Sequence, residues 1–144
     1  MHKDLDAATS AKEPLGIAAQ ELEATIAARA GDRKKAYELY RKAADREANI
    51  MDTEPPAYPR PGVEGWANAA LALGDYATAE KEYREALGRR PGSGRAFFGL
   101  AASLEGLGKT TEARSRAAKA WANADANLPQ MQKLRTSTAA GAQQ

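Results

Sequence analysis

One pattern of residues returns along this chain at a fixed spacing. A glycine is followed, five and twelve positions later, by alanines, and the whole set recurs 34 positions downstream. An internal repeat of this length constrains the fold more than any local preference, because each copy can bury its apolar face only against its neighbours. The first set is Gly74, Ala79 and Ala86, and the second is Gly108, Ala113 and Ala120.

A third copy lies upstream and is displaced. Gly31 is followed by Ala36 and Ala43 at the same offsets, but Gly31 and Gly74 lie 43 positions apart, so nine extra residues separate the two copies. The surplus falls in the sequence MDTEPPAYPRPG, which contains four prolines. Proline removes a backbone donor and biases the residue before it to extended conformations. We therefore predict a proline-rich connector over about residues 51–62.

Composition favours closely packed helices. Hydrophobic residues make up 43% of the chain, many of them alanine, and Val63 is the only valine. Alanine has the highest helix propensity and lets helices approach one another, whereas strands favour valine. Apolar spacing and breaks predict three helix pairs in an all-α fold, with helices over about residues 14–29, 33–50, 61–73, 76–89, 93–107 and 110–124.

The ends of the predicted domain follow from the same reading. The first helix is expected to start at Pro14, a favoured first-turn residue, and to bury one face. We expect a helical domain over residues 13–128, a flexible segment over residues 1–12 and a disordered polar tail over residues 129–144. The expected buried face consists of Leu15, Ala18, Leu22 and Ile26.

In its period, its small residues and its turn glycines, the chain resembles the tetratricopeptide repeat family. Gly31, Gly74 and Gly108 suit the left-handed conformation that ends a helix sharply. The resemblance implies three antiparallel helix-turn-helix pairs stacked as a short right-handed α-solenoid. Roughly residues 50–130 also resemble the C-terminal repeat segments of many uncharacterised bacterial proteins of this family.

The resemblance further implies a protein-binding surface. In this family the first helix of each pair lines a concave groove that binds extended or helical peptides. Carried over by register, this assigns to the groove Glu21, Thr25, Arg29, Glu64, Asn68, Leu71, Arg95, Phe98, Ala102 and Glu105.

Two details of that groove have alternative interpretations. Asn68 and Arg95 partly match a set that clamps a peptide C-terminal carboxylate in some family members, but the first-helix lysine and asparagine are missing. A solvated polar face is the simpler interpretation. Glycines at Gly65, Gly99 and Gly106 either let a partner approach the backbone or relieve crowding between helices.

Catalysis, cofactor binding and metal binding are not expected. The chain has no cysteine, and its single histidine, His2, lies at the terminus. Asp52, Glu54 and Glu64 could in principle meet around a hard cation, but a solvated acidic loop explains them better.

Nucleic acid and membrane partners are not expected either. Basic and acidic residues number 21 and 19, a near balance that gives no bulk field for a polyanion. No stretch approaches the length of a membrane span. We expect a cytoplasmic protein, with an exported protein whose leader was removed as the alternative.

The leading functional hypothesis is an adaptor that binds a peptide or helix of a partner protein. A second hypothesis is self-association into a homodimer through exposed ends around the first helix or through Trp121, near the end of the last helix. A third is a non-catalytic accessory protein for an enzyme encoded beside it.

Overall fold

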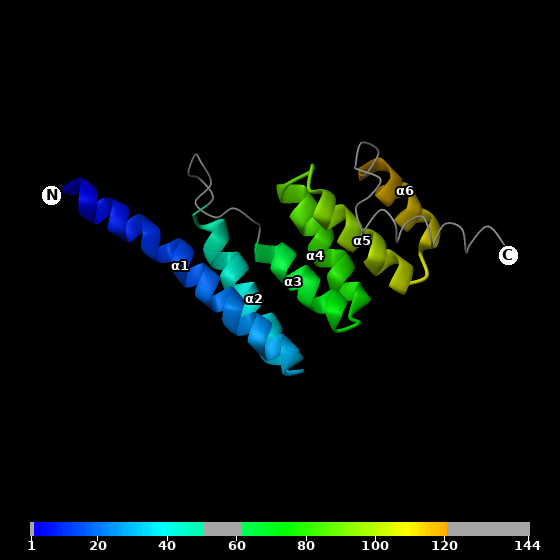
Figure 1. Ribbon diagram of the computed structural model, residues 1–144, viewed down its shortest axis with the longest axis horizontal. Helices are drawn as coiled ribbons and strands as arrows, with labels where there is room; N and C mark the ends of the chain where they lie inside the picture. Colours follow the sequence, from blue (N-terminus) through cyan, green and yellow to red (C-terminus); the bar gives the residue numbers. More distant parts are fainter. Residues whose placement is uncertain (1, 51–61, 121–144) are drawn as a thin grey trace, which may run out of the picture.

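The computed structural model describes residues 2–50 and 62–120, all but the turns between helices being helical. The helices are α1 (His2–Arg29), α2 (Arg33–Ala48), α3 (Gly62–Ala72), α4 (Tyr76–Arg89), α5 (Gly94–Gly106) and α6 (Thr110–Ala120). Figure 1 shows the pairs α1–α2, α3–α4 and α5–α6 following one another along the long axis of the molecule. The predicted all-α fold of stacked helix pairs is confirmed for these residues. Most of the predicted connector, the predicted tail and Trp121 lie outside them.

The three turns within the pairs share one geometry. Gly31, Gly74 and Gly108 have φ angles of 81°, 71° and 76°, which are accessible to glycine at little cost. At the first turn, the Gly31 N–H donates to the carbonyl of Ala28 and the Asp32 N–H donates to that of Ala27, both at 3.0 Å. Equivalent pairs of bonds close the other two turns. The glycines predicted to end these helices therefore do so in the left-handed conformation.

The residue after each glycine distinguishes the third turn from the other two. Asp32 and Asp75 cap α2 and α4, accepting backbone N–H bonds from Lys35 and Thr78 at 3.1 and 3.2 Å. Each cap satisfies a donor that the start of a helix leaves without an intrahelical partner. Lys109 occupies this position in the third turn, and its Nζ instead lies 2.9 Å from Glu80 Oε2 on α4.

Small residues at the contacts between these helices are buried. Ala67, Ala79, Ala86, Ala101 and Ala113 are almost fully inaccessible, and Tyr83, Leu100 and Leu104 fill the spaces between them. These residues belong to one cluster that continues from α3 through α6. Small residues allow the helices to approach closely, so this cluster holds the last two pairs together.

The predicted buried face of α1 is wrong. Leu15, Leu22 and Ile26 are 70%, 61% and 60% exposed, and Ala18 is exposed as well. α1 instead packs through Ile17 and a run of small residues, mainly against α2. The face of α1 that carries small residues packs against α2 because α2 also presents alanines there. Larger side chains would hold the two helices apart. The buried residues of α1 are Ile17, Glu21, Ala24, Ala27 and Ala28.

α1 also begins earlier than expected. It starts at His2 and runs through Pro14, which lies inside the helix rather than in its first turn. The preceding segment is rich in alanine, lysine and aspartate, and these residues permit a helical backbone up to the proline. α1 consequently extends well past the end of α2 (Figure 1). The flexibility expected of residues 1–12 stays a prediction.

Two glycines on α5 receive aromatic rings from α4. A Cβ on Gly99 would overlap the ring of Tyr83, and a Cβ on Gly106 would overlap that of Tyr76. At these two positions rings of the same chain fill the space that a Cβ would occupy, so the glycines relieve crowding between helices.

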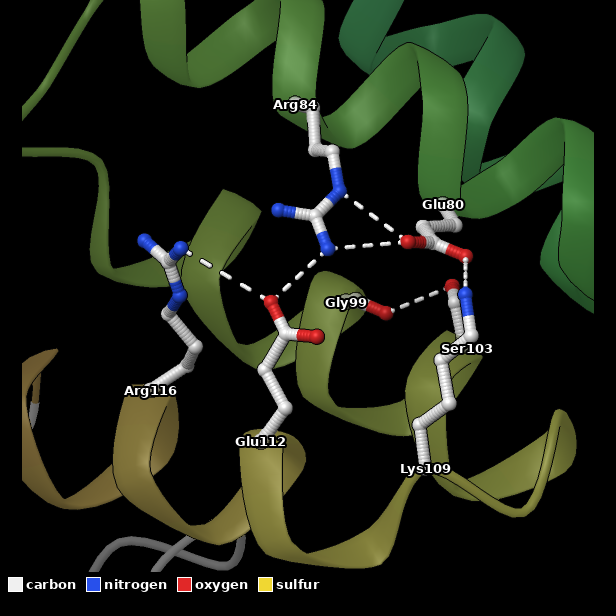
Figure 2. A network of polar contacts seen from close by, with 7 residues as sticks. All are labelled: Glu80, Arg84, Gly99, Ser103, Lys109, Glu112 and Arg116. Atoms are coloured by element: carbon white, nitrogen blue, oxygen red, sulfur yellow. Dashed lines mark hydrogen bonds and ion pairs between the residues drawn. The ribbon is translucent and has the colours of Figure 1, made fainter.

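Ion pairs join the second and third pairs at the surface, as Figure 2 shows. Arg84 Nη2 lies 2.8 Å from both Glu80 Oε1 on its own helix and Glu112 Oε1 on α6. Lys109 contacts the other oxygen of Glu80. Hydrogen bonds from Lys109 and Arg84 hold the pKa of Glu80 below its ordinary value of 4.5.

Candidate binding groove

A pocket of about 460 Å³ lies between the first helices of the first two pairs. Four residues of α1 form one wall, and α3 from Gly65 onward, together with the following Leu73, forms the other. Tyr40 of α2 contributes from a third side. The volume falls in the range typical of sites that bind small molecules or anchor side chains. The lining residues are Glu21, Thr25, Ala28, Arg29, Tyr40, Gly65, Asn68, Ala69, Ala72 and Leu73.

Small side chains on α3 create the space. Gly65, Asn68, Ala69 and Ala72 follow one another at steps of three, one and three residues, which places them on one face of a helix. Ala28 lies opposite this face on α1. Because α1 and α3 make few contacts with each other, space is left between them. The pocket therefore results from alanine and glycine at positions where larger residues would close the gap.

Hydrogen bonds hold the polar lining in place. Thr25 Oγ1 donates to the backbone carbonyl of Glu21 and lies 2.8 Å from the hydroxyl of Tyr40, which is buried. On the opposite side, the hydroxyl of Tyr83 donates to Asn68 Oδ1 at 2.6 Å. Burial raises the pKa of Tyr83, and the negative charge of Glu64 adds to the effect, so this hydroxyl remains a donor. Asn68 is exposed, and its amide nitrogen adds a donor to the pocket wall.

The pocket differs in charge between its two ends. Glu21, which is buried, lies at one end of the α1 wall, and Arg29, which is exposed, lies at the other. Eight helical residues separate them, a distance of about 12 Å along the axis. Beside the basic end, Arg33 Nη2 donates to the carbonyl oxygen of Leu73 at 3.2 Å.

The structure brings together part of the predicted groove. Arg29 and Asn68 line the same pocket, together with Glu21 and Thr25 from the same prediction. Glu64 is buried, and its Oε1 lies 3.5 Å from Nε of Arg95, whose side chain is largely exposed. These two residues therefore form an ion pair between α3 and α5.

The remaining predicted groove residues do not line the pocket. Phe98 and Ala102 are half-buried on α5, and Glu105 is exposed near its end. Leu71 packs against the hydrophobic cluster. Their assignment to a longer groove stays a prediction.

Six lining residues are missing from the predicted groove: Ala28, Tyr40, Gly65, Ala69, Ala72 and Leu73. For the α3 residues a signal was available, because Ala69 lies four positions after Gly65 and Ala72 lies four positions after Asn68, which places these residues on one face. Tyr40 gave no such signal, since a large aromatic residue at helical spacing is usually part of a core.

Trp66 has a structural place on the neighbouring face of α3. Its ring centroid lies 5.7 Å from that of Tyr37 on α2, and Lys81 Nζ lies 5.8 Å from it. Tyr37 also donates a hydrogen bond to Asp75 Oδ2 at 3.0 Å. Burial, followed by this bond, raises the pKa of Tyr37 to about 12. The cluster links the first pair to the second beside the pocket.

Comparison with known protein families agrees with the repeat fold of the second half of the chain. A tetratricopeptide repeat model matches residues 70–137, just under half of the chain, from the end of α3 through α6 and beyond. Residues 70–137 are therefore similar to tetratricopeptide repeats. Such repeats are in general protein–protein interaction modules and are typically non-catalytic. No curated protein and no solved structure gives a significant match.

The α1–α2 pair lies outside the matched tetratricopeptide stretch, but its turn has the same glycine conformation and the same hydrogen bonds as the matched turn at Gly108. Among the residues described, no three or more His, Cys, Asp or Glu side chains gather where they could hold a metal ion. Within the same residues no helix is both long and apolar enough to cross a membrane.

Proposed function

We propose that this chain is a non-catalytic adaptor that holds a peptide or helix of a partner protein against its first helices, with the α1–α3 pocket as the anchoring point. The observation that carries the proposal is the pocket itself. Four residues assigned to the groove by family register, namely Glu21, Thr25, Arg29 and Asn68, line it together.

The lining suits a side chain inserted from a peptide. Small apolar residues on α3 would contact an apolar group, and the amide of Asn68 would donate a hydrogen bond to a backbone carbonyl. Arg29 at the open end favours an acidic group in the same peptide. Burial of one anchor in such a pocket is how many peptide interfaces gain most of their affinity.

Selection from a displayed library of random peptides would provide a probe for this site. The strongest selected peptide is then measured by isothermal titration against the wild-type chain and against Ala72→Trp, which fills the pocket from an exposed position. Ala48→Trp is the matched control, since Ala48 is also an exposed helical alanine but lies outside the pocket.

The proposal predicts that Ala72→Trp weakens peptide binding by at least about tenfold, while Ala48→Trp leaves it unchanged. Equal affinity for both variants would reject the pocket as the anchoring point. Arg95→Ala and Phe98→Ala, measured with the same peptide, test whether the groove extends over α5. A loss of affinity in either variant supports the longer groove.

A further inference from the structure

α1 is apolar on two opposite faces. Ile17 is completely buried on the face toward α2, whereas Leu15, Leu22 and Ile26 on the other face are 60–70% exposed. Ala19, between them, is also exposed. At 100° per residue, these four exposed positions lie within about 60° of one another around the helix axis. They form one continuous apolar stripe, and among the described residues no other helix covers it.

Isolated apolar residues at a surface need no explanation, but three large ones aligned on one helix do. The arrangement matches the pattern by which a helix packs against another helix, with apolar residues at steps of four, three and four. The stripe therefore has the form of a helix-packing face without its partner helix.

The spacing of the stripe is symmetric about its own midpoint. Positions 15, 19, 22 and 26 read the same in both directions, so a second copy running antiparallel places Leu15 opposite Ile26 and Ala19 opposite Leu22. At the centre a small residue then faces a large one, which lets the two helices approach closely. A two-fold interface requires this kind of self-complementary surface.

We propose that the stripe formed by Leu15, Ala19, Leu22 and Ile26 binds the same stripe of a second copy of this chain, with the two α1 helices antiparallel. Glu23 and Arg29 border the stripe and are both exposed. In this register each Glu23 lies level with Ala18 of the other copy, about 7.5 Å along the axis from the other Glu23, so the two Glu23 carboxylates are not directly opposite.

The size of the stripe sets the strength of the dimer. It covers about 16 Å of helix axis, which is short compared with interfaces that bury the usual ~800 Å² per partner. We expect a dimer that dissociates on dilution. The stripe and the pocket share no residue, and they adjoin at Arg29, which borders the stripe and lines the pocket.

Sedimentation velocity over about a hundredfold range of concentration tests the proposal. The wild-type chain should shift from monomer to dimer, and Leu22→Glu should raise the dissociation constant by at least about tenfold. Thr111→Glu adds the same charge at an exposed position in the first turn of α6 and should leave it unchanged. Circular dichroism checks that both variants keep their helix content. A chain that stays monomeric throughout, or a dimer that Leu22→Glu leaves intact, overturns the proposal.

The register can be tested separately because the chain has no cysteine. Ala19→Cys and Leu22→Cys variants carry single thiols that should face each other across the interface. Oxidation of an equimolar mixture should then give more disulfide between the two variants than within either one. Preferential crosslinking of Leu22→Cys to itself would overturn the antiparallel arrangement.

Discussion

The ring of Tyr83 on α4 lies against the backbone of Gly99 on α5, so closely that any Cβ at residue 99 would overlap it. The hydroxyl of the same tyrosine reaches Asn68 on α3. Tyr83 thus connects three helices of two adjacent pairs, and the glycine is what allows the ring to lie there. The contact links the stability of the stack to the wall of the pocket.

Gly99→Ala should therefore destabilise the protein, by roughly 1–3 kcal/mol, because the added methyl group forces the ring to move in a packed core. Gly88→Ala is the control. Gly88 also lies within a helix, but a Cβ there meets nothing within 4 Å, so the higher helix propensity of alanine should stabilise the protein by about 0.5–1 kcal/mol. Urea unfolding measures both. Equal effects of the two substitutions would contradict the packing described.

The corrected face of α1 makes a second prediction. Ile17→Ala should lower the free energy of unfolding by about 2–5 kcal/mol, because Ile17 is fully buried. Leu22→Ala should change it by less than about 0.5 kcal/mol at a concentration where the chain is monomeric. Thermal unfolding of the two variants at low concentration would show the difference. If Leu22→Ala lowered the free energy of unfolding more than Ile17→Ala does, the buried face expected from the sequence would be the correct one.

Asp75 has two structural roles, and a double-mutant cycle can separate them. It caps α4 through Thr78 and accepts the hydroxyl bond of Tyr37. Burial alone would raise the pKa of Asp75, but the bonds from Thr78 and Tyr37 and the charge of Arg33 outweigh it and lower that pKa. Asp75→Ala should lower stability by about 1–2 kcal/mol.

Asp32→Ala is the matched comparison, since Asp32 caps α2 in the same way without the tyrosine bond. Combined with Tyr37→Phe, the Asp75 substitution should be less than additive by about 0.5–1 kcal/mol, while the Asp32 substitution should be additive. Additivity for Asp75 as well would mean that the Tyr37 bond contributes nothing measurable.

The ion pairs of Figure 2 predict a loss of stability in acid. Bonds to Lys109 and Arg84 lower the pKa of Glu80, and the bond to Arg84 lowers that of Glu112. A carboxyl whose pKa is lower in the folded state stabilises it above the unfolded pKa, and this contribution is lost as the pH falls. Unfolding midpoints should therefore decrease from about pH 5 to pH 3.

Glu80→Gln removes the central carboxylate and should make that decrease shallower. Glu105→Gln, at an exposed position on α5 outside the network, should follow the wild-type curve. Urea unfolding at several pH values gives the comparison. Identical slopes for Glu80→Gln and the wild-type chain would show that the network does not contribute to acid sensitivity.

The sequence by itself determined the features that depend on neighbouring residues. The repeat spacing, the left-handed glycines and the bounds of α4 follow from local sterics and helix propensity, and all were predicted. Four residues that the family resemblance assigned to a groove, Glu21, Thr25, Arg29 and Asn68, line one pocket, and their role in binding stays a prediction.

Only the tertiary structure decided which face of a helix is buried. α1 carries apolar residues on two faces, and its alanine face packs because α2 presents alanines as well, so Leu22 remains outside. Likewise, Gly99 receives a ring because Tyr83 lies across from it, and the pocket exists because small residues of α1 and α3 meet. Such outcomes depend on how the surfaces of two distant segments fit together, and the periodicity of a single segment does not specify that fit.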